Sequence, residues 1–201
     1  MTLQRGAGWW CGISVLLAAG ALLAHGRVSD AIDWQPLLAW SEPWRWWSAA
    51  WVHLSDLHLH ANLAGTLLVA LLGVASDVPV RAAMAWLIAW PLTQLGLLAQ
   101  PALAHYGGLS GVLHAGVAVV AMQLMIEGPR RRRLIGVTVF AGLALKLFSE
   151  TPWVGPVQHP QGIDIATVPL AHVSGAVSGG LIACALLLGA QRPRLRIGSH
   201  D

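Results

Sequence analysis

Charged side chains are scarce in this chain, and their scarcity excludes an ordinary soluble domain. Asp, Glu, Lys and Arg make up 10% of the 201 residues, whereas 56% of the residues are hydrophobic. Soluble domains carry roughly 25% charged residues. The length suits one domain. Because only helices and closed barrels satisfy the backbone inside a bilayer, long apolar runs predict an all-α membrane protein surrounded by lipid.

Cysteine is equally scarce, which excludes a disulfide framework and a zinc cluster. Cys11 and Cys184 are the two cysteines, and both lie in apolar segments. No cofactor and no metal are expected from this pattern. The first apolar segment, 8–24, is long for the apolar region of a signal peptide and has no convincing cleavage site. We expect it to remain as a membrane span.

Six apolar segments can be read as membrane spans, each near the roughly 20 residues that a bilayer requires. The predicted architecture is a bundle of six transmembrane helices in a single domain. The fifth segment is the shortest and lies between four arginines and a loop rich in proline and glycine. The approximate spans are 8–24, 54–74, 82–99, 110–126, 134–148 and 168–189.

Arginine is concentrated on one side of this six-span arrangement. That side holds Arg5, Arg81, the run 130–133 and the short basic tail 190–201. Loops rich in Lys and Arg stay in the cytoplasm, so both termini are predicted to be cytoplasmic. The arginine run could also bind nucleic acid, but its place between two spans favours a role in topology. We therefore expect no nucleic-acid partner.

Six of the eleven tryptophans lie in the first loop on the opposite side, between residues 25 and 52. Tryptophan prefers the headgroup level of a membrane, so this loop is expected to lie in the interface. Most of these rings need no other explanation than an aromatic belt. Trp44 and Arg45 are the exception, because a fixed arginine can hold the loop together through hydrogen bonds to carbonyl groups.

The second span begins with a group of polar residues. His58 and Asn62 are four residues apart and share one helix face, whereas His53 and His60 lie near the outer end. Polar groups within a span usually face the protein interior. Three histidines also leave open a metal or haem site, although no second cluster with ligand spacing accompanies them.

The fourth span begins with the glycine-rich stretch 106–114. It places Ser110 between Gly108 and Gly111, at the predicted first turn of an apolar helix. The first turn of a helix has unpaired backbone N–H groups, and these donors can stabilise a developing oxyanion. An ordinary turn followed by a helix remains the simpler interpretation of this stretch alone.

The sixth span carries His172 one turn before a face of small residues. Gly175 and Gly179 form a Gly-x-x-x-Gly face, and Gly111, Ala115 and Gly116 form a similar face on the fourth span. Small faces let membrane helices approach closely. Ser110 and His172 are therefore predicted to lie at similar depth on touching helices.

A serine hydroxyl becomes an effective nucleophile when a nearby histidine accepts its proton. His172 is the predicted base for Ser110. The predicted donors to the oxyanion are His58, Asn62 and the N–H of Ser110. No acidic residue is placed by the sequence to orient His172, because Asp56 and Asp164 are not demanded by the pattern. The sequence therefore predicts a Ser–His dyad.

These motifs resemble those of the rhomboid intramembrane serine proteases of the six-span bacterial type. The matching pieces are Trp44-Arg45, His53-x4-His58-x3-Asn62, Gly108-Leu-Ser110-Gly111 and Ala171-His172-x2-Gly175-x3-Gly179, and they span residues 40 to 185. The resemblance implies a six-helix rhomboid-like fold, with Ser110 as nucleophile, His172 as base and His58, Asn62 and the Ser110 N–H as oxyanion hole. It also implies a structural or water-organising role for His53 and lateral support from the Trp44-Arg45 loop.

His114 departs from the pattern of many rhomboids, which have an aromatic residue four positions after the serine. Its spacing places it on the face of Ser110, where it could stack on His172 or accept a proton itself. The stretch 108–114 is similar to the rhombosortase branch. That resemblance implies membrane-anchored substrates with a C-terminal Gly-Gly motif, an apolar span and a basic tail. It also implies a bacterial inner membrane with the active site facing the periplasm.

Three hypotheses follow from the sequence. The first is an intramembrane peptidase, with the fifth span and the loop 149–167 as gates for the substrate. The second is a non-catalytic rhomboid-like binder or chaperone, against which the presence of both Ser110 and His172 argues. The third is a haem or metal protein that uses His53, His58, His60 and His172.

Overall fold

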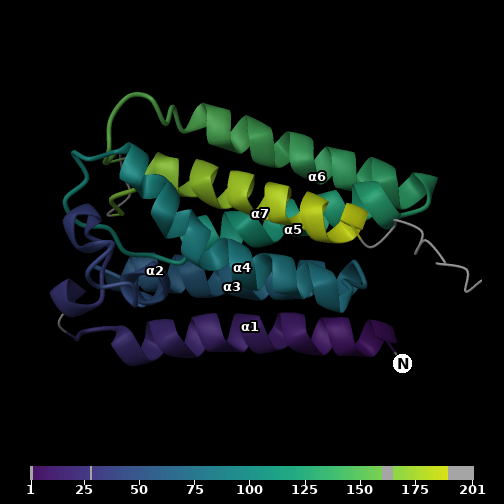
Figure 1. The fold of residues 1–201 in the computed structure, drawn as a ribbon, viewed down its shortest axis with the longest axis horizontal. Helices are drawn as coiled ribbons and strands as arrows, with labels where there is room; N and C mark the ends of the chain where they lie inside the picture. Colours follow the sequence, from purple (N-terminus) through teal and green to yellow (C-terminus); the bar gives the residue numbers. More distant parts are fainter. Residues whose placement is uncertain (1, 28, 160–164, 190–201) are drawn as a thin grey trace, which may run out of the picture.

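The computed structural model describes residues 2–27, 29–159 and 165–189. Within these ranges the chain is 74% helical with no strands, as predicted. The basic tail 190–201 and Asp164 lie outside the described residues. Six long helices run along the bundle: α1 (Thr2–Ala24), α3 (Asp56–Ala75), α4 (Val80–Leu95), α5 (Ser110–Glu127), α6 (Arg130–Ser149) and α7 (Pro169–Gly189) (Figure 1).

Five of these segments are long and apolar enough to cross a membrane. They are Arg5–Ala24, Asp56–Ala75, Val80–Ala99, Ser110–Glu127 and Pro169–Gly189. The fifth predicted span, 134–148, lies within α6, which is not among the five. This 20-residue helix begins with four arginines and has Lys146 near its end, so its apolar stretch is shorter than in the others.

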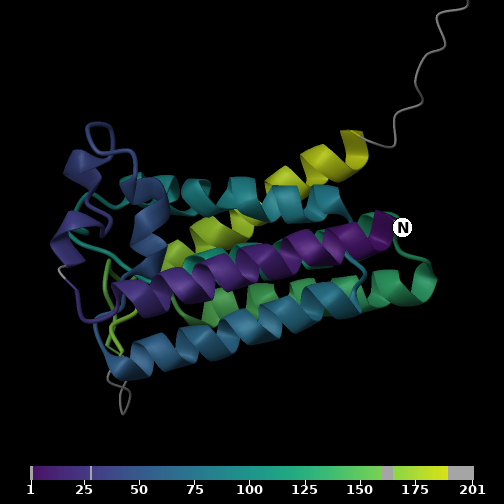
Figure 2. The ribbon, with the colours of Figure 1, turned by 90° about the horizontal axis from the view of Figure 1, so that it is seen from below.

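Shorter helices and loops gather at one end of the bundle, which we call the loop end. It contains α2 (Arg45–Ser48) and four short 3-10 helices, Ser29–Ala31, Pro36–Leu38, Ala49–Trp51 and Gly96–Ala99. The segments 25–27, 29–55, 96–109 and 150–159 meet there (Figures 1 and 2). Arg81 and Arg132 lie at the other end, the arginine end, in ion pairs with Glu127 and Asp77.

Local sequence explains where the helices that carry the predicted site begin. The Ser55 side chain accepts a hydrogen bond from the backbone N–H of His58, 3.2 Å away, and so caps the start of α3. Gly108 has a φ of +140°, which only glycine adopts without strain, and α5 starts two residues later. Proline is favoured in the first turn of a helix, and α7 begins at Pro169.

The core lies around α5, which packs against α3, α4, α6 and α7. Eleven of its eighteen residues are buried. A Cβ atom added to Gly175 would lie 1.9 Å from the carbonyl oxygen of Gly111, and one added to Gly179 would lie 2.4 Å from that of Ala115. The backbones of α5 and α7 are therefore in contact. Gly116 was expected on this face, but it packs against Val69 and Trp86 of α3 and α4.

Substituting Gly175 by alanine is expected to destabilise the protein by about 1–3 kcal/mol or more, because the added methyl group overlaps backbone atoms that cannot rotate away. Thermal unfolding in detergent measures the change. Gly180→Ala on the same helix is the matched control, because a Cβ at Gly180 meets nothing within 4 Å. Equal melting temperatures for the two variants would contradict the close approach of α5 and α7.

Candidate active site

Ser110 and His172 are in hydrogen-bond contact at the loop end of the bundle. The Ser110 Oγ lies 2.8 Å from Nε2 of His172. Ser110 is the first residue of α5, and His172 lies in the first turn of α7. The close packing of the two helices at Gly111 and Gly175 holds them at this separation, and His172 is only 5% exposed.

The tautomer of His172 follows from its second partner, Glu150. Nδ1 of His172 lies 2.7 Å from the Glu150 Oε2. Burial alone raises the pKa of the Glu150 carboxyl, but hydrogen bonds and charge from His172 and Lys146 outweigh it and lower the pKa to about 2. The carboxylate is thus ionised at neutral pH and can only accept, so Nδ1 carries the proton. In the neutral imidazole, Nε2 then has the lone pair that faces the Ser110 hydroxyl.

Glu150 was not predicted as a site residue, and the prediction that no acidic residue orients His172 is wrong. Glu150 follows the last residue of α6, 22 positions before His172, so its place depends on how α6 packs. One signal was present in the sequence. Lys146 and Glu150 form an ionisable pair at the end of an apolar segment, where such groups are a hypothesis of function by default.

His114 stacks on His172, with ring centroids 4.2 Å apart and planes 11° from parallel. Its Nδ1 lies 2.6 Å from the carbonyl oxygen of Ser110, and because a carbonyl only accepts, this nitrogen donates. The Nδ1–H of His114 thus donates to the α5 backbone, and the face of its ring packs against His172. Between the two histidines, the one whose nitrogen contacts the Ser110 hydroxyl is His172.

The residues predicted for the oxyanion hole border the same cavity as Ser110. His58 and Asn62 come from one face of α3, and the Asn62 side-chain amide donates to the His58 carbonyl at 3.1 Å. A Cβ at Gly108 would lie 3.0 Å from the His58 ring, so glycine leaves room for that imidazole. Because Ser110 begins α5, its N–H has no partner within the helix.

His53 supports His58 from behind. Its ring meets the His58 ring edge to face, with centroids 4.8 Å apart, and its Nδ1 lies 3.1 Å from the Trp51 carbonyl oxygen. Burial, aided by the neighbouring His58, lowers the pKa of His53 to about 4. A neutral His53 ring at physiological pH therefore packs against His58 without adding charge.

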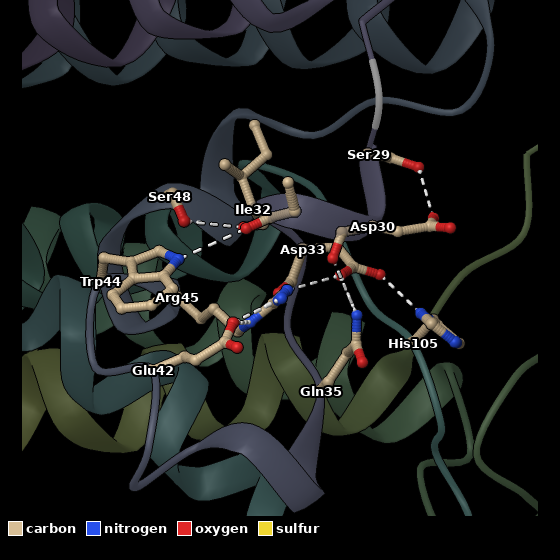
Figure 3. Close-up of polar contacts among 11 residues, drawn as sticks. Ser29, Asp30, Ile32, Asp33, Gln35, Glu42, Trp44, Arg45, Ser48 and His105 are labelled. Carbon is tan, nitrogen blue, oxygen red and sulfur yellow. Dashed lines mark hydrogen bonds and ion pairs between the residues drawn. The ribbon is translucent and has the colours of Figure 1, made fainter.

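The first loop is held by Arg45, which is 4% exposed (Figure 3). Its guanidinium donates to the Asp33 carbonyl at 2.7 Å, to the Asp33 carboxylate at 3.0 Å and to the Glu42 carboxylate at 2.7 Å. The sequence predicted only carbonyl acceptors, and the two carboxylates are an addition. Trp44 donates from its indole to the Ala31 carbonyl at 3.3 Å.

The same loop is tied to the segment that carries the serine. Trp34 and Tyr106 exchange two backbone hydrogen bonds of 2.7 and 2.9 Å, and the Gly108 N–H donates to the Ala49 carbonyl at 3.0 Å. Asp33 adds a side-chain link, because its Oδ2 lies 2.7 Å from Nδ1 of His105 (Figure 3). Arg45 therefore supports the position of Ser110 indirectly, through the loop backbone.

A cavity of about 650 Å³ opens beside Ser110. Polar groups lie at one end of it, and aliphatic side chains line much of the rest. The lining comes from α3, α5, α6 and the segments 105–107 and 165–168. The apolar wall includes Leu68, Val69, Leu113, Val117 and Leu143. Such a cavity suits an extended or helical segment of mostly apolar side chains that approaches Ser110 from between α3 and α6.

Among the described residues, two clusters of His, Asp and Glu side chains bring possible metal ligands together. His114, Glu150 and His172 bring ligand atoms within 4.8 Å of one another. Lone pairs on imidazole lie in the ring plane, and the stacked rings of His114 and His172 keep those planes nearly parallel, so they do not converge on one ion. The second cluster consists of Asp30, Asp33 and His105. Its central residue, Asp33, already pairs with Arg45, Gln35 and His105. Neither cluster favours a metal centre.

The four histidines predicted for a haem or metal site do not point their ring nitrogens at one position. They are His53, His58, His60 and His172. His60 is exposed on α3, whereas His53 and His172 are buried. His53 and His58 meet ring edge to ring face instead of turning their nitrogens to a common point.

No protein-family model matches the chain, and no curated protein is similar enough to count as a match.

Proposed function

We propose that the protein is an intramembrane serine endopeptidase that cleaves membrane-anchored proteins near the membrane surface. The observation that carries the proposal is the 2.8 Å contact between the Ser110 Oγ and Nε2 of His172. A buried histidine beside a helix N-terminus activates a serine and leaves N–H donors free for an oxyanion. The motifs that resemble the rhomboid proteases, and their rhombosortase branch, give the same residues the same roles.

In the proposed reaction, His172 takes the Ser110 proton on Nε2 while Oγ attacks the carbonyl carbon of the scissile peptide bond. The resulting oxyanion receives hydrogen bonds from the Ser110 N–H, His58 and Asn62. The intermediate collapses as His172 returns its proton to the leaving amine, which breaks the C–N bond. Water then attacks the acyl ester with His172 as base, and the released acid and free Ser110 complete the cycle.

Substrate is proposed to reach Ser110 sideways, through the apolar cavity between α3 and α6. Only Gly136 and Leu143 of α6 are buried, so this helix is a proposed gate, together with the described parts of the predicted loop, 149–159 and 165–167. Residues 160–164 of that loop lie outside the described residues. We propose that α6 also crosses the membrane, as the fifth of six spans. Both termini then lie in the cytoplasm of a bacterial inner membrane, because Arg81 and the run 130–133 share one end, and the active site faces the periplasm.

The proposed substrates carry a C-terminal Gly-Gly motif, an apolar span and a basic tail. A direct test co-expresses the protein with a secreted reporter domain fused to such a tail. Release of the domain from the membrane, measured by immunoblot, is the expected result. Replacing Gly-Gly by Leu-Leu in the reporter is expected to stop release. An intact reporter beside a protein that reacts with a fluorophosphonate would reject this substrate class while keeping the peptidase.

Filling the cavity is expected to separate cleavage of a protein from reaction with a small probe. Gly142 lines the cavity, and a Cβ there meets nothing within 4 Å. Gly142→Leu should slow reporter release about tenfold, because misplacing the substrate segment spoils the geometry of attack. Its rate of fluorophosphonate labelling should change by less than about twofold, since the Ser110–His172 pair is untouched.

Gly12→Leu on α1 is the matched control, because that glycine also faces open space but lies away from the cavity. It should leave both rates unchanged. Normal reporter release by Gly142→Leu would contradict access through the space between α3 and α6. A binder or chaperone without catalytic activity would neither release the reporter nor react with the probe.

A further inference from the structure

We propose that Glu150 is a positioning residue that completes a Ser110–His172–Glu150 relay; this inference rests on the proposed function. Glu150 Oε2 accepts the Nδ1 proton of His172 at 2.7 Å, and Nε2 on the other side of the ring contacts Ser110 at 2.8 Å. The three groups therefore form one line of hydrogen bonds. The serine and histidine come from α5 and α7, and the carboxylate comes from the end of α6.

The carboxylate does two things for the histidine. It holds the proton on Nδ1, so that Nε2 is unprotonated and aimed at the serine hydroxyl. It also places a negative charge beside the imidazolium that forms when His172 takes the Ser110 proton. Both effects act at the moment of attack, so they lower the barrier of the chemical step more than they tighten substrate binding.

Glu150 is the charged group that contacts the His172 ring. Among the residues that the structure describes, which do not include Asp164, the groups that face the ring are Ser110 and His114 from α5, His58 from α3 and Glu150 from the end of α6. Among them the carboxylate is the one anion. Lys146 pairs with the other carboxylate oxygen, Oε1, and so fixes the direction of the Glu150 carboxylate.

A purely structural reading treats Glu150 as half of a helix-end ion pair with Lys146. That ion pair uses Oε1 of Glu150 and joins it to Lys146 in the last turn of α6. Exposed ion pairs of this kind contribute little stability. It does not require the second oxygen to face His172. The carboxylate is 21% exposed and His172 is 7% exposed in its side chain, so their contact is largely shielded from water.

The placement of Glu150 directly after the end of α6 connects the relay to the substrate cavity. The first half of α6 lies tightly on α5, where a Cβ at Gly136 would be 2.8 Å from the Ala121 carbonyl oxygen. Gly142, further along the helix, has open space beside it and borders the cavity. A movement of the second half of α6 that widens the cavity would also draw Glu150 away from His172.

The test compares Glu150→Gln with wild type in inactivation by a fluorophosphonate, which needs no knowledge of the natural substrate. The maximal inactivation rate should fall about 100-fold, and the concentration for half-maximal rate should change less than about threefold. Glu127→Gln is the matched control, because Glu127 is also in an ion pair but at the arginine end. It should leave both values unchanged. An unchanged maximal rate in Glu150→Gln would overturn the inference.

A second readout follows the histidine itself. In Ser110→Ala protein labelled with ¹⁵N-histidine, His172 should be protonated on Nδ1 and show a strongly downfield proton signal, assigned by its loss in His172→Asn. Adding Glu150→Gln should remove that downfield shift. The same spectrum with and without Glu150 would reject the positioning role. If Ser110→Ala still cleaves the reporter, the proposed function fails; if only Glu150→Gln remains fully active, the inference alone fails.

Discussion

Ser110→Ala is expected to abolish cleavage of the Gly-Gly reporter while leaving the protein folded. Removing Oγ removes the atom that attacks the carbonyl, and loss of a serine nucleophile lowers kcat by roughly 10⁴ to 10⁶. The fold should survive, because the Ser110 side chain does not cap α5 and the close contact of Gly111 with Gly175 is unchanged. Reporter release in cells measures cleavage, and the melting temperature in detergent measures whether the protein stays folded.

Ser178→Ala provides the matched control for this substitution. Ser178 is a half-buried serine on α7, about two turns beyond His172. Losing its hydroxyl should leave reporter release unchanged. Release by Ser110→Ala at the rate of Ser178→Ala would reject Ser110 as the nucleophile, whatever the state of the histidines.

His172→Ala and His114→Ala are expected to differ greatly, although their rings are stacked. His172→Ala removes the nitrogen that lies 2.8 Å from Ser110 Oγ and should reduce kcat by about 10⁴-fold or more. His114→Ala removes only a stacking partner. Because such pairs contribute about 0.5–1.5 kcal/mol, the expected loss is at most about tenfold. The rate of fluorophosphonate labelling measures both.

His60→Ala controls for removing a histidine from this end of the bundle, because His60 is exposed on α3. It should label at the wild-type rate. A larger loss in His114→Ala than in His172→Ala would show that His114 is the base. The hydrogen bond from its Nδ1 to the Ser110 carbonyl would then have to be broken in the active protein.

Small residues made the meeting of α5 and α7 predictable from sequence. Gly175 and Gly179 recur every four positions, and the backbone contacts lie where that face indicated. The starts of α5 and α7 were also predictable. Gly108 allows the positive φ of the turn before α5, and Pro169 is a residue type favoured in the first turn of a helix. Gly116 was misplaced, since a small residue also accommodates large rings such as Trp86 and does not specify which neighbour approaches.

The partners of Arg45 and His172 were harder to predict, because they depend on how distant segments pack. Asp33 and Glu42 hold Arg45 from within a loop that has no regular periodicity. Glu150 reaches His172 only because α6 continues beyond the predicted end of the fifth span at residue 148. Four arginines at its start and one lysine near its end also make α6 the least apolar of the six long helices, so hydropathy describes it poorly.

The most direct test of the account is to label the detergent-purified protein with a fluorophosphonate and identify the modified residue by mass spectrometry. We expect a single covalent adduct on Ser110, which is lost in His172→Ala and retained in His114→Ala. Because the probe reacts only with an activated serine, such an adduct would establish the Ser110–His172 pair before any substrate is known. A folded wild-type protein that forms no adduct, or forms one on another serine, would contradict the account.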